Sequence, residues 1–124
     1  MTTFRFRGFK VYQDARKFRR TVRAMLKKFP ATEKFTLCDQ INRSCLSILL
    51  NIAEGSAKTS DRDFARFLTM SIASVSEVVA CFDLAYDDGI VSEMDSKAIE
   101  REAEEIAKQL GGFIKILKKL KVKS

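Results

Sequence analysis

The chain has 124 residues, 46% hydrophobic and 31% charged, a composition typical of one globular domain with a single core. Its net charge of +7 favours an anionic partner, most often nucleic acid, but gives no information about the fold. The absence of histidine excludes histidine-based catalysis and most zinc sites. Three cysteines without a C-x-x-C spacing are expected to be reduced thiols. We see no signal peptide and no run of 18 apolar residues, so we expect a cytoplasmic protein without a membrane span.

The first nine residues alternate between phenylalanine and arginine from Phe4 onwards. We expect this basic segment to dock on the folded domain, and base stacking by its rings is the alternative. A helix is predicted from Lys10 to Phe29, because apolar residues recur at intervals of four and three and Pro30 cannot continue a helix. Those apolar residues are Val11, Ala15, Phe18, Val22, Met25 and Phe29.

The second predicted helix, Leu37 to Glu54, is apolar over more than half of its circumference. A helix of this kind needs cover on several sides, so we expect it to be the central helix of the fold. Gly55 follows it and is expected to end it in a left-handed conformation.

A third helix is predicted from Asp61 to Asp88 and a fourth from Glu93 to about Leu120. Their core stripes, which include Leu68 and Ile99, again recur at intervals of four and three, as does the ridge of the second helix that includes Ile41. Both are preceded by a serine with an acidic residue three positions later, a pattern typical of helix N-caps. Within the fourth helix, Gly111-Gly112 costs about 1 kcal/mol per glycine relative to alanine, and we expect a close helix approach to compensate.

Four helices joined by short links predict an all-α, antiparallel up-down-up-down four-helix bundle, a single domain spanning residues 1–124 with basic tails at 1–9 and 121–124. The second and third helices are too apolar for a monomeric bundle. We therefore expect a ring-like homo-oligomer that covers the remaining apolar surface.

Residues 1–30 hold ten of the basic residues and a single acid, Asp14. On the first helix four cations share the side opposite the apolar stripe, and no acid lies among them. Because like charges at this spacing repel, the pattern favours an anion-binding surface, with a merely solvated face as the alternative. The basic residues predicted to contact nucleic acid are Arg16, Arg19, Arg20, Arg23, Lys27, Arg5, Arg7, Lys118, Lys119 and Lys121.

Other chemistry-bearing residues are given structural roles. Cys38 and Cys45 lie on the apolar side of their helix, so we expect core packing rather than metal binding. Glu54 is expected to pair with Arg43, Arg62 or Arg66, and Glu77 is a second carboxylate without a predicted partner. We therefore predict no cofactor, no metal and no catalytic residue, and expect a protein that is not an enzyme.

Several short motifs are similar to those of the "four helix bundle protein" family, also called the 23S rRNA intervening-sequence proteins. The most specific is Asn51-Ile52-Ala53-Glu54-Gly55, and the resemblance covers about residues 9–120. Tyr12, where many relatives carry tryptophan, and the strongly basic first helix depart from the family pattern. The supporting motifs are Phe29-Pro30, Leu37-x-x-Gln40-Ile41-x-Arg43, Ser60, Phe64, Phe67-Leu68, Ser74, Glu77 and Asp88-Gly89-Ile90.

The resemblance implies a pentamer of four-helix bundles with a central channel. Related proteins include the accessory variability protein of diversity-generating retroelements, which binds nucleic acid and a reverse transcriptase. Two functions are thus open. The first is a homopentamer that binds RNA or DNA, as an accessory factor to a reverse transcriptase. The alternative is a structural module that is encoded by an rRNA intervening sequence, recruits a protein and has no nucleic-acid role.

Overall fold

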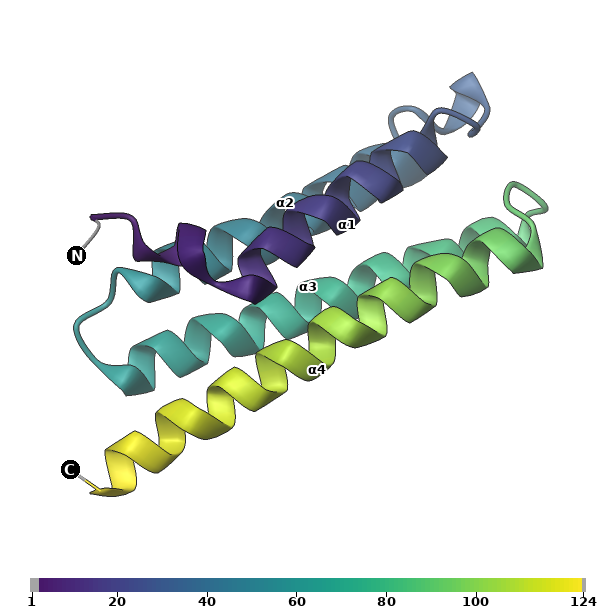
Figure 1. Ribbon diagram of the computed structural model, residues 1–124. Coiled ribbons are helices and arrows are strands. Elements are labelled where there is room, and N and C mark those ends of the chain that lie inside the picture. The colour runs from purple at the N-terminus through teal and green to yellow at the C-terminus, as the bar shows by residue number, and fades with distance from the viewer. Residues whose placement is uncertain (1–2, 124) are drawn as a thin grey trace.

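The computed structural model describes residues 3–123, with side chains from residue 3 to residue 120. Four helices run up-down-up-down and antiparallel, as predicted, and the described residues include no strand (Figure 1). Short 3₁₀ helices, η1 and η2, precede the first and second of them. The elements are η1 (Arg5–Gly8), α1 (Lys10–Leu26), η2 (Ala31–Glu33), α2 (Leu37–Ser56), α3 (Asp61–Asp87) and α4 (Glu93–Lys123).

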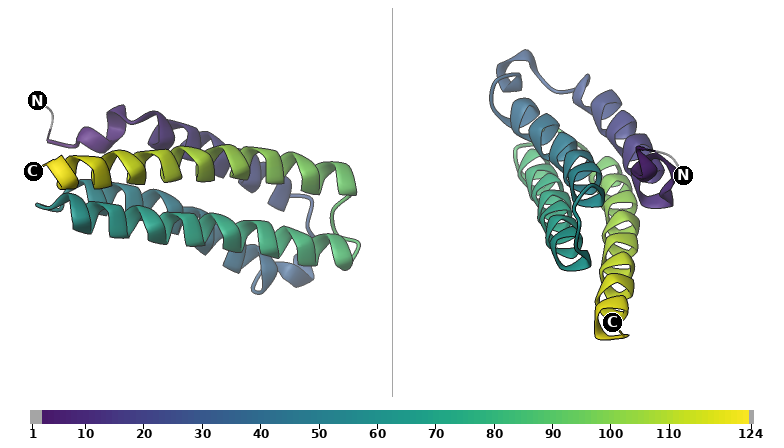
Figure 2. Two further views of the ribbon diagram at one scale, coloured as in Figure 1. Left: turned by 90° about the horizontal axis from the view of Figure 1, so that it is seen from below. Right: turned by 90° about the vertical axis from the view of Figure 1, so that its left-hand side faces the viewer.

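The two chain ends and the α2–α3 loop lie at the same end of the bundle (Figure 1). The linker between α1 and α2 and the α3–α4 turn lie at the opposite end, and the four helices surround one core (Figure 2). α3 packs along most of its length against both α2 and α4, whereas α1 approaches its neighbours more sparsely. The sparse contacts of α1 leave room for surface grooves beside it.

The core consists of the apolar stripes predicted from the sequence. Phe18, Ile41, Leu68 and Ile99, one from each helix, are at most 1% exposed. Burial of each such side chain contributes about 1.5–3 kcal/mol. Both predicted caps are present, since the Ser60 and Ser92 hydroxyls each accept a hydrogen bond at 3.1 Å from a backbone N–H three residues on.

α1 ends three residues earlier than predicted, at Leu26. The N–H groups of Lys28 and Phe29 donate to carbonyls three residues back, so the chain tightens into a turn. Pro30 disfavours a helical backbone conformation at Phe29, which explains the early end of α1. The Phe29 ring packs edge-to-face on the Phe82 ring of α3.

Two predictions about glycines were wrong. Gly55 does not end α2 in a left-handed conformation, because the helix continues to Ser56. Among the described residues, Gly89, with φ +73°, is the one glycine with a positive φ. A β-carbon at Gly55 would lie 2.7 Å from the Phe67 Cβ, so this glycine permits close packing of α2 on α3. Gly111 and Gly112, in contrast, have open space within 4 Å, so no close helix approach compensates for them in the monomer.

α2 is not enclosed on all sides, contrary to our expectation of a central helix. Leu46 and Leu50 on its outer side are 44% and 56% exposed, and Met70 on α3 is 39% exposed. A bundle helix contacts two neighbours, so an apolar arc wider than those contacts stays in solvent. α3 is also long and apolar enough by composition to cross a membrane, but ten of its residues are buried in the bundle, as expected of a core helix.

Candidate nucleic-acid interface

The outer side of α1 and its C-cap residue, Lys27, carry a row of cations. Arg16, Arg20, Arg23 and Lys27 are exposed, whereas the apolar stripe on the opposite side is buried. Among the described residues, none of these four side chains forms an ion pair. At about 1.5 Å per residue, they extend over about 16 Å. We call these four residues the basic face.

Arg19 occupies a different position from the basic face. It is half-buried on the side of α1 that faces α2, close enough to Cys45 for its charge to act on the thiol. Burial raises the pKa of Cys45 to about 12, and the positive charge of Arg19 opposes this shift. Cys45 is therefore a packed core thiol, as predicted, and only part of the Arg19 side chain is available to a ligand.

The single acid of α1 is directed away from the basic face. The Asp14 carboxylate accepts hydrogen bonds from Lys10 Nζ at 2.6 Å and from Gln109 Nε2 of α4 at 2.8 Å. The hydrogen bond from Lys10, followed by that from Gln109, holds the pKa of Asp14 below its usual value. Asp14 thus joins α1 to α4 and forms no ion pair with the basic face.

The N-terminal segment docks on the bundle, as predicted, and Arg5, one residue of the predicted site, takes part in this docking. The rings of Phe6 and Phe9 pack against the core. Arg5 donates two hydrogen bonds to the Ser56 carbonyl oxygen, and its guanidinium lies over the Phe64 ring. Because its donors serve the end of α2, Arg5 has a structural role. Arg7 remains exposed, with its guanidinium 5.1 Å from the centre of the Phe4 ring.

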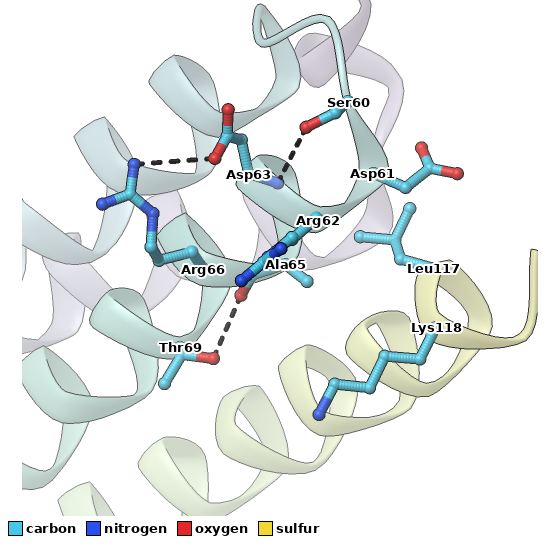
Figure 3. Close-up of a pocket in the computed structure, with 9 residues that line it drawn as sticks. All are labelled: Ser60, Asp61, Arg62, Asp63, Ala65, Arg66, Thr69, Leu117 and Lys118. Atoms are coloured by element: carbon cyan, nitrogen blue, oxygen red, sulfur yellow. Dashed lines mark hydrogen bonds and ion pairs between the residues drawn. The ribbon is translucent and has the colours of Figure 1, made fainter. Parts of the chain in front are cut away.

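Cations also gather at the end of the bundle that holds both termini. Lys118 and Lys119 of α4 are exposed there, while the Lys121 side chain lies outside the described residues. Lys118 borders a pocket of about 900 Å³ between the start of α3 and the end of α4 (Figure 3). Asp61 and Asp63 also line this pocket, and Asp63 pairs with Arg66 at 3.7 Å. Its mixed charge makes it a weaker candidate for a polyanion than the basic face.

The carboxylates singled out in the sequence serve structure or lie free in solvent. Glu77 accepts hydrogen bonds from Ser44 and Gln40, which lower the pKa of its carboxyl and join α3 to α2. The predicted pairing of Glu54 was wrong, because Glu54 forms no ion pair among the described residues. Arg43 pairs with Asp39 and Arg66 with Asp63, acids one turn away on the same helix, and Arg62 forms no ion pair there. No group of three or more cysteines or acids in the described chain could hold a metal.

One surface feature was missed by sequence reasoning. The linker before α2 places Lys34 beside a pocket formed by the end of α1, and Phe35 next to it is 83% exposed. An aromatic residue within a polar linker was the sequence signal for an exposed ring. The pocket had no such signal, because it depends on how the end of α1 and the start of α2 are placed in the fold. This pocket adjoins the basic face, because Arg23 and Lys27 belong to both.

These features define a class: an antiparallel four-helix bundle with one strongly basic helix. The family model of the 23S rRNA-intervening sequence protein matches residues 7–112, and the chain belongs to this family.

A similar solved structure is that of a protein of unknown function from the S23 ribosomal protein family of Bacteroides thetaiotaomicron VPI-5482. The two are 25% identical, with a TM-score of 0.76, over 85% of this chain and 98% of the other. No curated protein matches this chain.

Proposed function

We propose that this protein is a non-enzymatic nucleic-acid-binding protein that contacts phosphates through the basic face of α1. The observation that carries the proposal is the row of four exposed cations without an ion pair in the described chain. Like charges at this spacing repel one another and cost a few tenths of a kcal/mol per pair. A bound polyanion would remove that repulsion and release its own counterions.

The spacing of the cations is compatible with a nucleic-acid backbone. The phosphates of one strand of a duplex rise by about 3.4 Å each along the helix axis, so the length of about 16 Å spans several phosphates. Arginine and lysine contacts to phosphate position a ligand without reading its sequence. We therefore propose binding of RNA or DNA without strong sequence preference, supported at its edges by Arg7, Lys118 and Lys119.

The test is a salt titration of binding to a structured RNA, a DNA duplex and single-stranded DNA. Four phosphate contacts predict that log K falls with log salt with a slope of about −3 to −4. The variant Arg16/Arg20/Arg23/Lys27→Gln is expected to lose most of the affinity and most of the slope. Absence of binding to all three ligands at about 50 mM salt would refute the proposal.

A matched control variant distinguishes the contribution of the basic face to binding from the effect of the overall net charge. Arg43, Lys97, Arg101 and Lys108 are also exposed cations, but they lie on α2 and α4. Their replacement by glutamine lowers the net charge by the same four units and is expected to leave the slope nearly unchanged. If both variants lose equal affinity, the interaction depends on overall charge rather than on the basic face.

We also propose that the protein is a homo-oligomer, with the pentamer of the family resemblance as the expected state. The exposed Leu46, Leu50 and Met70 support self-association, because side chains of this size gain free energy when a neighbouring copy covers them. If the same surface instead recruits another protein, the chain is an interaction module. A reverse transcriptase is the partner to test first, given the resemblance to the retroelement accessory proteins.

A further inference from the structure

A pocket of about 330 Å³ lies between the end of α1 and the start of α2, at the end of the bundle remote from both termini. Leu26, Phe29 and Pro30 give it apolar walls, and the Asn42 amide supplies a group able to donate and accept hydrogen bonds. Its volume falls within the range of small-molecule sites in proteins, about 300–1,000 Å³.

Three cations border the pocket, and no carboxylate lines it. Arg23, Lys27 and Lys34 supply the charge. The acid Glu33 lies outside the lining; its charge acts on Cys38, and its Oε1 accepts a hydrogen bond from Thr36 at 2.8 Å. An apolar cavity with a cationic rim matches a ligand that combines a flat apolar body with a phosphate. The larger pocket beside Lys118 lacks this match, because Asp61 and Asp63 line it.

The neighbouring linker adds an exposed aromatic ring. Phe35 is 83% exposed, and Lys34 Nζ lies 5.4 Å from the centre of its ring. A ring this exposed contributes little to the stability of the bundle. Aromatic rings beside a cation are the usual platforms on which proteins stack the bases of single-stranded nucleic acids.

We propose that this pocket and the Phe35 ring receive unstacked bases of a single-stranded nucleic acid whose phosphates follow the basic face. The inference rests on the proposed function, because Arg23 and Lys27 must contact the same strand. It adds a preference: bases inside a duplex are paired and stacked and cannot enter the pocket, so single strands gain contacts that duplexes lack.

The test compares a 20-nucleotide single strand with a duplex of the same length, by fluorescence anisotropy at one salt concentration. Phe35→Ala removes the ring, and Ala31→Leu narrows the pocket at an exposed position. Neither substitution changes the charge. Each is expected to weaken single-strand binding on the order of tenfold, to leave duplex binding unchanged and to preserve the salt slope, since no phosphate contact is lost.

Met94→Ala is the matched control. Met94 is an apolar residue that is 79% exposed at the start of α4, and its loss is expected to affect neither ligand. Equal weakening of single-strand and duplex binding by Phe35→Ala, or no weakening of either, would overturn the pocket proposal while leaving the basic face in place. No binding by the unmodified protein to either ligand would overturn both proposals.

Discussion

Arg5 and Ser56 lie 51 positions apart in sequence, yet the Arg5 guanidinium donates from Nε at 3.1 Å and from Nη2 at 2.9 Å to the Ser56 carbonyl oxygen. That carbonyl belongs to the last turn of α2, where backbone acceptors have no partner within the helix. The contact thus joins the N-terminal segment to the end of α2 and satisfies an acceptor that α2 itself cannot.

Replacement of Arg5 by alanine should therefore lower stability rather than binding. We expect a loss of about 1–2 kcal/mol, because hydrogen bonds from a charged donor and the contact with the Phe64 ring are removed together. Arg7→Ala is the control and should change stability by less than about 0.5 kcal/mol, since the Arg7 guanidinium contacts the Phe4 ring but donates no hydrogen bond among the described residues. Urea unfolding followed by circular dichroism measures both, and equal effects would contradict the structural role of Arg5.

The glycines of α2 and α4 predict opposite outcomes for the same substitution. Gly55→Ala should destabilise the protein by about 1–2 kcal/mol, because the new β-carbon meets the Phe67 Cβ at 2.7 Å and that atom cannot move without α3. Gly112→Ala should stabilise α4 by up to about 1 kcal/mol, since the space around it is open. Thermal unfolding of the two variants tests the pair. A stability loss at Gly112 would mean that a neighbouring copy packs there.

The hydrogen bonds to Glu77 predict a dependence of stability on acid pH. Because Ser44 and Gln40 lower the pKa of Glu77 in the folded state, its carboxylate stabilises the fold above the ordinary pKa of 4.5. This contribution is lost as the pH falls through the lower folded value. For an exposed carboxylate we expect less than about 1 kcal/mol.

Glu77→Gln therefore should be less stable than the unmodified protein near neutral pH, and the difference should vanish at strongly acid pH. Chemical unfolding at a series of pH values checks this. Glu54→Gln is the control, since no ion pair or side-chain hydrogen bond to Glu54 occurs among the described residues, and it should change stability by less than about 0.5 kcal/mol. A constant difference at all pH values for Glu77→Gln would indicate an effect of shape rather than charge.

The exposed apolar side chains of α2 predict the oligomeric state of the protein in solution. We expect the chain to elute as a homo-oligomer, with a mass near five times its 14.1 kDa. Leu46→Glu combined with Leu50→Glu should yield a folded monomer, because these exposed positions tolerate charge in the monomer but not in an apolar interface. Light scattering coupled to size exclusion measures the mass. Met94→Glu is the control, and a monomeric unmodified protein would refute self-association.

The sequence by itself determined the helices and much of their packing. Spacings of three and four residues placed Phe18, Ile41, Leu68 and Ile99 in the core, because a 3.6-residue repeat puts them on one side of a helix. Pro30 and the serine caps located the helix boundaries to within a few residues, since these are local effects of backbone geometry and hydrogen bonding.

The tertiary structure decided which charged side chains remain available to bind a ligand and where pockets form on the surface. Arg5 and Arg16 are alike in sequence, and both are exposed, but only Arg5 is held to the fold by hydrogen bonds, which it donates to the end of α2. Gly55 and Gly112 likewise differ only in what faces them. The pocket beside Phe29 forms between the end of α1, the linker and the start of α2. Such properties depend on the distances between segments remote in sequence, which local periodicity does not encode.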